Sequence, residues 1–199
     1  DSWASFMQNI YGSYTGGRWL WHVFAASLTA LFVLTGLDWQ FYLLTRQEWL
    51  PPFIYAAGIG GFFIPVVVPL LLYLLGWRMN SARIRFSGLC GAYAVVISWC
   101  ISSFYKALTG RIEPAFIITS LEDRSRTFHF GFLEYGIYWG WPSSHTAVAF
   151  ALAVALAVFF QGKMTVRVLM FSYAFFIAFG AAVGFHWLSD VVAGAIVGS

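Results

Sequence analysis

Two histidines of the chain stand where polar residues meet long apolar segments, and their surroundings suit phosphoryl transfer. His145 opens one apolar segment, and His186 closes another, four residues before Asp190. A carboxylate one helical turn from an imidazole can hold the ring and fix its tautomer, as in other nucleophile–base pairs. One imidazole could then attack phosphorus while the other protonates the leaving oxygen. The spacing therefore predicts a reaction at a phosphate group.

Groups able to bind an anion accompany these histidines. Ser143 and Ser144 precede His145 at the start of a predicted helix, whose N-terminal N–H groups and dipole favour an anion. Lys106 and Arg111 close the preceding apolar segment and add two cations. Ionisable residues at membrane depth are costly and tend to mark function. We therefore expect the two serines, the lysine and the arginine to bind a substrate phosphate.

A loop over residues 121–130, LEDRSRTFHF, supplies Arg124 and Arg126 as accessory phosphate ligands. Glu113 and Glu134 are the acidic residues on either side of this loop, and we interpret them as candidate ion-pair partners for its arginines. No acidic cluster in the sequence has the spacing of a metal site. The sequence therefore predicts neither a metal nor another cofactor.

The composition places these residues in a membrane protein. Hydrophobic residues make up 60% of the chain and charged residues 10%, against about 25% charged in soluble domains. The net charge of +3 is scattered, whereas nucleic-acid binding requires a basic patch or stripe. The expected partners are therefore membrane lipids and a lipid substrate, not nucleic acid. Cys90 and Cys100 lie about 15 Å apart along one predicted helix and cannot pair.

The apolar stretches have, or approach, the roughly 20 residues that span a bilayer. We predict transmembrane helices over 19–37, 53–77, 89–108, 145–161 and 168–187, and a sixth from Leu188 onward. An aromatic, amphipathic segment over 38–52 separates the first two and predicts an interfacial helix. The sequence thus predicts an all-α, polytopic membrane bundle of six transmembrane helices. Residues 1–199 form one domain, with the catalytic motifs in 106–190.

The Lys and Arg residues of the short loops orient the predicted spans. The loops over 78–85 and 163–167 carry basic residues and no acids, which indicates a cytoplasmic location. The loop over 106–144 mixes four basic with four acidic residues and should face the opposite side, where the end of the fifth span also emerges. Both termini are then cytoplasmic. We expect a bacterial inner-membrane protein whose site faces the periplasm.

The motifs K-x4-R-x-x-P, P-S-S-H and H-x3-D, in this order, resemble those of the type-2 phosphatidic acid phosphatase superfamily, relatives of the vanadium haloperoxidases. They run from Lys106 to Pro114, from Pro142 to His145 and from His186 to Asp190. The usual family pattern is K-x6-R-P, P-S-G-H and S-R-x5-H-x3-D. The resemblance covers roughly residues 85–199.

The resemblance implies a role for each matched residue. His186 is implied to be the nucleophile that forms a phosphohistidine, with Asp190 as its orienting partner. His145 is implied to be the general acid for the leaving group and later the base that activates water. The family requires no metal. The implied phosphate ligands are Lys106, Arg111, Ser143 and the backbone at Ser144.

Three positions depart from the family pattern. Glu113 replaces the arginine of R-P, Phe179-Gly180 replace the Ser-Arg pair, and Ser144 replaces the glycine of P-S-G-H. Because charge-assisted hydrogen bonds are the strong ones, loss of two arginines weakens phosphate binding.

The predicted activity is hydrolysis of a lipid phosphate or diphosphate of phospholipid, polyprenyl or lipid A type, through a phosphohistidine on the outer membrane face. Two alternatives stay open. One is a lipid phosphotransferase that passes the phosphoryl group or phospho-headgroup to another acceptor. The other is a non-catalytic protein that binds or transports an anionic lipid. The oligomeric state has no signal in the sequence.

Overall fold

A computed structural model describes residues 2–45, 50–115 and 122–199, with the side chains of residues 2–6 left undescribed. Over these ranges the chain forms eight α-helices and no strand beyond one isolated β-bridge between Arg111 and Phe128. The helices are α1 (Ser2–Ser13), α2 (Trp19–Thr35), α3 (Leu37–Thr45), α4 (Pro51–Arg78), α5 (Ala82–Thr109), α6 (Ser144–Phe159), α7 (Met164–Gly184) and α8 (Leu188–Gly198).

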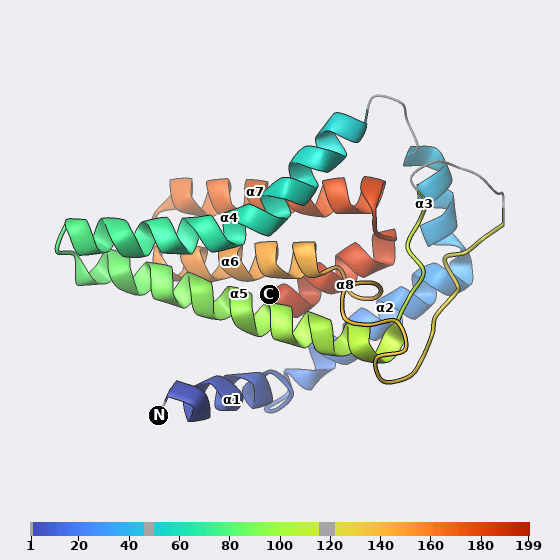
Figure 1. The fold of residues 1–199 in the computed structure, drawn as a ribbon, viewed down its shortest axis with the longest axis horizontal. Coiled ribbons are helices and arrows are strands. Elements are labelled where there is room, and N and C mark those ends of the chain that lie inside the picture. The colour runs from blue at the N-terminus through green and yellow to red at the C-terminus, as the bar shows by residue number, and fades with distance from the viewer. Residues whose placement is uncertain (1, 46–49, 116–121) are drawn as a thin grey trace.

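Helices α4 to α7 lie lengthwise beside one another and form the body of the bundle (Figure 1). Helix α6 lies at its centre, where small side chains such as Ala149 and Ala153 are fully buried and let neighbours approach closely. Glycines act in the same way between α4 and α5, since a Cβ on Gly88 would lie 2.5 Å from the carbonyl oxygen of Pro69. Close packing through small residues is typical of membrane helices.

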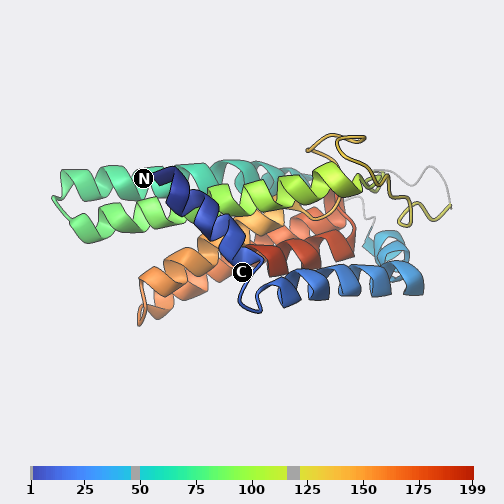
Figure 2. The same cartoon turned by 90° about the horizontal axis from the view of Figure 1, so that it is seen from below.

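The chain bends sharply between α2 and α3. Gly36 ends α2 with a left-handed φ of 72°, a conformation that glycine adopts without a steric penalty. The two helix axes differ by 72°. Helix α8 packs against α2 and α6 (Figure 2). As a result α3, the segment after α5 and the turn between α7 and α8 lie at the same end of the molecule (Figure 1).

The predicted all-α membrane bundle is confirmed. Helices α4, α5 and α7 are long and apolar enough to cross a membrane, and the bent pair α2–α3 could form a fourth span. Helices α6 and α8 are shorter apolar helices. Large apolar side chains such as Phe62, Val66 and Leu70 are exposed along α4, as expected for a surface that faces lipid.

Two boundaries differ from the prediction in ways that concern the site. The predicted span over 168–187 ends at Gly184, so His186 lies in the turn before α8 rather than inside a helix. The predicted interfacial segment over 38–52 contains α3, while its residues 46–49 lie outside the described part of the chain.

Candidate active site

Hydrogen bonds to the backbone bring the three sequence motifs to one place. The Ser143 N–H, at the N-cap of α6, donates to the backbone carbonyl of Asp190 over 2.9 Å. The Lys106 ammonium at the end of α5 donates to the carbonyl of Tyr138 over 2.9 Å. The second and third motifs are therefore joined directly, and the first is tied to the loop that leads into the second.

A completely buried guanidinium, that of Arg111, forms the centre of this region. Its Nη2 binds the carboxylate of Asp38 on α3 at 2.7 Å, and its Nη1 binds the carboxylate of Asp190 on α8. It also donates from Nη1 to the Ser189 hydroxyl and from Nε and Nη2 to the carbonyl of Ser125. These five bonds use all five donors of a guanidinium. Unpaired buried charge is costly, so this network explains how an arginine can be fully buried.

This geometry differs from the prediction that Arg111 binds phosphate. Its donors are already bonded inside the protein, and two carboxylates neutralise its charge. Asp38 also accepts from the N–H and hydroxyl of Ser189, at the N-terminus of α8, where the helix dipole favours a carboxylate. Arg111 thus joins α3 to α8 and fixes Asp190.

The ring of His186 is 2% exposed and lies beside two carboxylates. Its Nδ1 is 3.6 Å from Oδ2 of Asp190 and 3.8 Å from Oε1 of Glu113, and this nitrogen has no hydrogen-bond partner among the described residues. Burial lowers the pKa of His186 below its ordinary value. The ring is therefore neutral near pH 7, which is the form that can act as a nucleophile.

Glu113 lies inside the site, beside the His186 ring. Burial raises the pKa of its carboxyl to about 8; the Lys106 ammonium opposes this shift and the Asp190 carboxylate adds to it. Near pH 7 most of this carboxyl is therefore protonated. The earlier interpretation of Glu113 as the partner of a loop arginine is replaced by a contact with the His186 ring.

The second imidazole, His145, lies in the first turn of α6 beside the same aromatic side chain as His186. The Phe185 ring centroid is 5.1 Å from that of His145 and 5.4 Å from that of His186. Gly61 of α4 makes room for the His145 ring, since an added Cβ would lie 2.9 Å from its Cδ2. The two predicted catalytic histidines thus both pack against one phenylalanine.

The two serines are placed differently. The Ser143 hydroxyl is buried and accepts hydrogen bonds from the N–H and hydroxyl of Thr146, so both bonds leave its hydrogen free to donate. The Ser144 hydroxyl pairs with that of Ser102 on α5 over 3.0 Å. Lys106 is 3% exposed, and an ammonium has three donors, so its bond to Tyr138 leaves capacity for a phosphate.

The two predicted accessory arginines point to different surroundings. Arg126 is 58% exposed and pairs with Asp123 at 3.3 Å, away from the histidines. Arg124 lines a cavity of about 20 Å³, enough for one water molecule, which Glu113 and Trp187 also line. Of the two, Arg124 is therefore the one close to the site.

Comparison with known protein families identifies the superfamily of the chain. A model of the PAP2 superfamily matches residues 87–199, more than half of the chain. The chain belongs to the PAP2 superfamily. Membership indicates phosphatase or phosphoryl-transfer activity on lipid-like substrates and confirms the resemblance found in the motifs. No curated protein and no solved structure gives a significant match.

The packing of Gly180 explains one departure from the PAP2 pattern. A Cβ built on Gly180 would overlap the Cβ of Ala57, because α7 and α4 touch at this point. An arginine side chain therefore has no room here without separation of the two helices. In this PAP2 protein the position serves helix packing.

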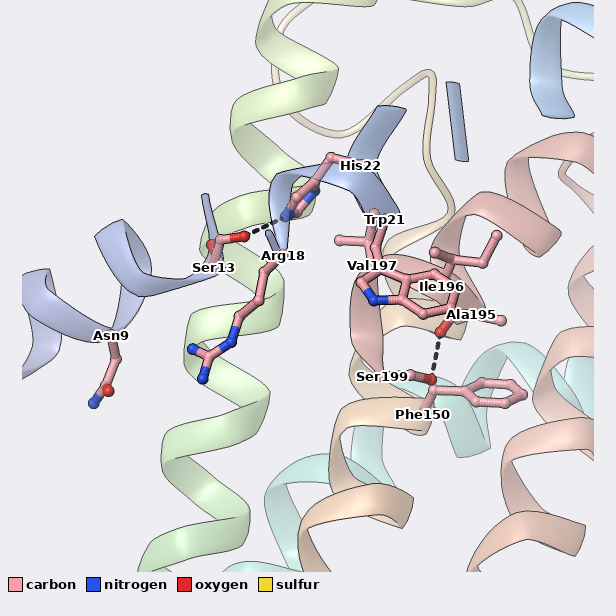
Figure 3. Close-up of a pocket in the computed structure, with 10 residues that line it drawn as sticks. All are labelled: Asn9, Ser13, Arg18, Trp21, His22, Phe150, Ala195, Ile196, Val197 and Ser199. Carbon is pink, nitrogen blue, oxygen red and sulfur yellow. Dashed lines mark hydrogen bonds between the residues drawn. The ribbon is translucent and has the colours of Figure 1, made fainter. Parts of the chain in front are cut away.

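A second, larger cavity lies away from the PAP2 motifs. It has a volume of about 710 Å³ and lies between the α1–α2 junction and the C-terminal end of α8 (Figure 3). His22 lies at this cavity, where its Nε2 binds the carbonyl of Ser13 at 3.1 Å and its ring stacks on Tyr14. None of the predicted site residues lines this cavity, so we place the reaction elsewhere.

Sequence reasoning missed Asp38 and the position of Glu113. Asp38 is completely buried, although it begins a segment interpreted as interfacial. A lone carboxylate directly after an apolar span is a signal that could have identified it, because buried charges require partners. The contact of Glu113 with His186 has no comparable local signal.

Proposed function

We propose that this PAP2 protein is an integral membrane phosphatase that removes phosphate from a lipid phosphate or diphosphate. One observation carries the proposal: a buried imidazole, that of His186, lies next to a carboxylate that Arg111 holds in place. His145 packs against the same Phe185 ring as His186. A nucleophile, an orienting carboxylate and an acid are the parts that phosphoryl transfer through a covalent intermediate requires.

The proposed reaction has two steps. The Nε2 atom of His186 attacks phosphorus, the bond to the leaving oxygen breaks, and His145 gives that oxygen a proton. His145 then takes a proton from water, which attacks the phosphohistidine and releases inorganic phosphate. Lys106, Ser143 and the backbone N–H groups at the start of α6 stabilise the phosphoryl oxygens.

The substrate class follows from the surroundings of the site. The histidines lie where apolar helices end, so a lipid tail could stay in the bilayer while the phosphate reaches His186. The basic loops at the opposite ends of the helices favour a site on the outer face, in a bacterial inner membrane the periplasmic one. Glycerophospholipid, polyprenyl and lipid A-type phosphates are the candidate substrates.

The experiment is a phosphate-release panel on these three lipid classes with a metal chelator present. We expect release from at least one class, and an acid-labile phosphohistidine in rapidly quenched samples. The variant His186→Ala should lose both signals, while His22→Ala, a histidine of the other cavity, should keep both. Full activity of His186→Ala would refute the nucleophile assignment, and headgroup binding without turnover would favour a lipid-binding protein.

A lipid phosphotransferase is the second candidate. His186 and Asp190 are only 2% and 1% exposed, so access of bulk water to the phosphohistidine is restricted. An alcohol or lipid phosphate could then replace water as the acceptor. Labelled phosphate found in a second lipid, rather than in solution, would identify this activity.

A further inference from the structure

The Nδ1 atom of His186 lies almost midway between two carboxyl groups. Asp190 Oδ2 is 3.6 Å away and Glu113 Oε1 is 3.8 Å away, in a part of the site where the histidine is 2% exposed. Both distances exceed the 2.7–3.2 Å of a hydrogen bond, and Nδ1 has no other partner among the described residues. An unmade bond at a buried nitrogen is costly, so a small ring rotation toward either carboxyl group is favoured.

The two carboxyl groups are not equivalent. Asp190 Oδ1 accepts from Arg111, and its Oδ2 accepts from the backbone N–H of Trp187 at 3.2 Å. The charge of Asp190 is therefore opposed by a buried guanidinium. Glu113 is not among the acceptors of Arg111, all five of whose donors are directed to other groups. The carboxyl group of Glu113 therefore faces His186 without a guanidinium bonded to it.

We propose that Glu113 is a second positioning residue for His186: its carboxyl oxygen accepts the Nδ1–H and shares with Asp190 the task of holding the ring. This inference rests on the proposed function, in which His186 attacks phosphorus. Glu113 touches the histidine ring on the Nδ1 side, whereas phosphorus bonds to the other nitrogen. It therefore acts through His186 and not on the substrate.

The expected consequence is greatest when the phosphohistidine forms. The other ring nitrogen then bonds phosphorus, the leaving oxygen departs with a proton from His145, and the imidazole becomes cationic with its proton on Nδ1. A carboxylate near Nδ1 stabilises that cation. Asp190, already paired with Arg111, does this only in part. Above about pH 8, where the carboxyl group of Glu113 is ionised, loss of its charge should therefore slow formation of the intermediate.

Three substitutions separate orientation from charge. Glu113→Gln keeps an acceptor for Nδ1–H but removes the charge, Glu113→Leu removes both, and Glu113→Arg reverses the charge. At about pH 9, where Glu113 is ionised, we expect phosphohistidine formation to slow by about 10-fold in the first variant and about 100-fold in the second, and still more in the third, with KM changed less than about threefold. Glu134→Gln, an exposed carboxyl of the neighbouring loop, is the matched control.

A readout that does not depend on turnover completes the test. In protein labelled with ¹⁵N at the histidine rings, the His186 signals report which nitrogen carries the proton. Glu113→Gln should keep the Nδ1–H form and Glu113→Leu should lose part of it, most clearly when combined with Asp190→Asn. Unchanged signals in Glu113→Leu, or a faster enzyme in Glu113→Arg, would overturn the inference. If His186 were not the nucleophile, the ¹⁵N signals should still respond to Glu113→Leu. The experiment therefore distinguishes an error in the proposed function from an error in the role of Glu113.

Discussion

Arg111 and Asp190 form an ion pair in which both side chains are shielded from solvent, with exposures of 0% and 1%. The same guanidinium binds Asp38 at 2.7 Å. The carboxylate expected to orient the nucleophile is therefore held by a residue expected to bind phosphate. Because Arg111 also binds Asp38, the position of Asp190 depends on α3, a helix outside the matched family region.

Replacing Arg111 should lower the free energy of unfolding as well as abolish activity. In Arg111→Met, Asp38 and Asp190 lose their buried partner, which should cost about 3–5 kcal/mol in the free energy of unfolding. Denaturant unfolding in detergent measures this change. Arg126→Met, at an exposed pair, should leave the unfolding midpoint unchanged. If Arg111→Met instead raised KM at unchanged stability, Arg111 would be a phosphate ligand after all.

The role of His145 can be tested with the leaving group. In His145→Ala, phosphohistidine formation from an alkyl lipid phosphate should slow by about 10²–10⁴-fold, because the leaving oxygen receives no proton. A nitrophenyl phosphate ester needs no such proton, so its first step should be nearly unaffected. Rapid-quench measurement of the intermediate compares the two substrates. Equal losses for both would show that His145 positions other groups rather than donates a proton.

Stability should depend on pH through Glu113. Its pKa is about 8 in the folded protein, above the ordinary value of 4.5, chiefly because of burial. The folded state therefore binds the proton more tightly, and this contribution to stability is complete below about pH 4.5 and is lost as the pH rises to about 8. The charged or titratable groups around Glu113 come from several elements. They are Lys106 from α5, Asp190 from α8, His186 from the turn, Glu122 and Arg124 from the loop, and Tyr42 from α3.

Glu113→Gln removes the titrating carboxyl group. Stability should then change less with pH between about 4.5 and 8. Melting temperatures between pH 4.5 and 8 in detergent give the comparison, with Glu134→Gln as the control. The variant should be more stable than the unsubstituted protein at pH 8. A parallel decline in both proteins would assign the pH dependence to another group.

Room for the His145 ring depends on one glycine. In Gly61→Ala the new Cβ would lie 2.9 Å from Cδ2 of His145 and 3.0 Å from Cγ2 of Ile177, so the imidazole must shift. Because misplacement by about 1 Å can cost about 100-fold in rate, we expect phosphohistidine formation to slow by about 10- to 100-fold. Gly58→Ala, on the same helix, meets Phe185 at an ordinary 3.6 Å and should remain active. Equal rates in the two variants would contradict this account.

The sequence by itself determined the features that depend on neighbouring residues. Long apolar stretches predicted each helix of the bundle body, α4 to α7. A continuous apolar stretch is a local property of the chain, and about 20 such residues form a helix that spans the bilayer. The four-residue spacing of His186 and Asp190 predicted that the two side chains lie close together, although His186 lies in the turn before α8 and not within the helix.

Only the tertiary structure decided how the charges pair. Arg111 and Asp38 are 73 residues apart, and no local sequence pattern predicts their contact. Glu113, which stands where the family carries an arginine, became a neighbour of His186 through the path of the loop after α5. Burial is the physical reason. Once a site is closed to water, each charge must find a partner, and the available partners depend on which segments the fold brings together.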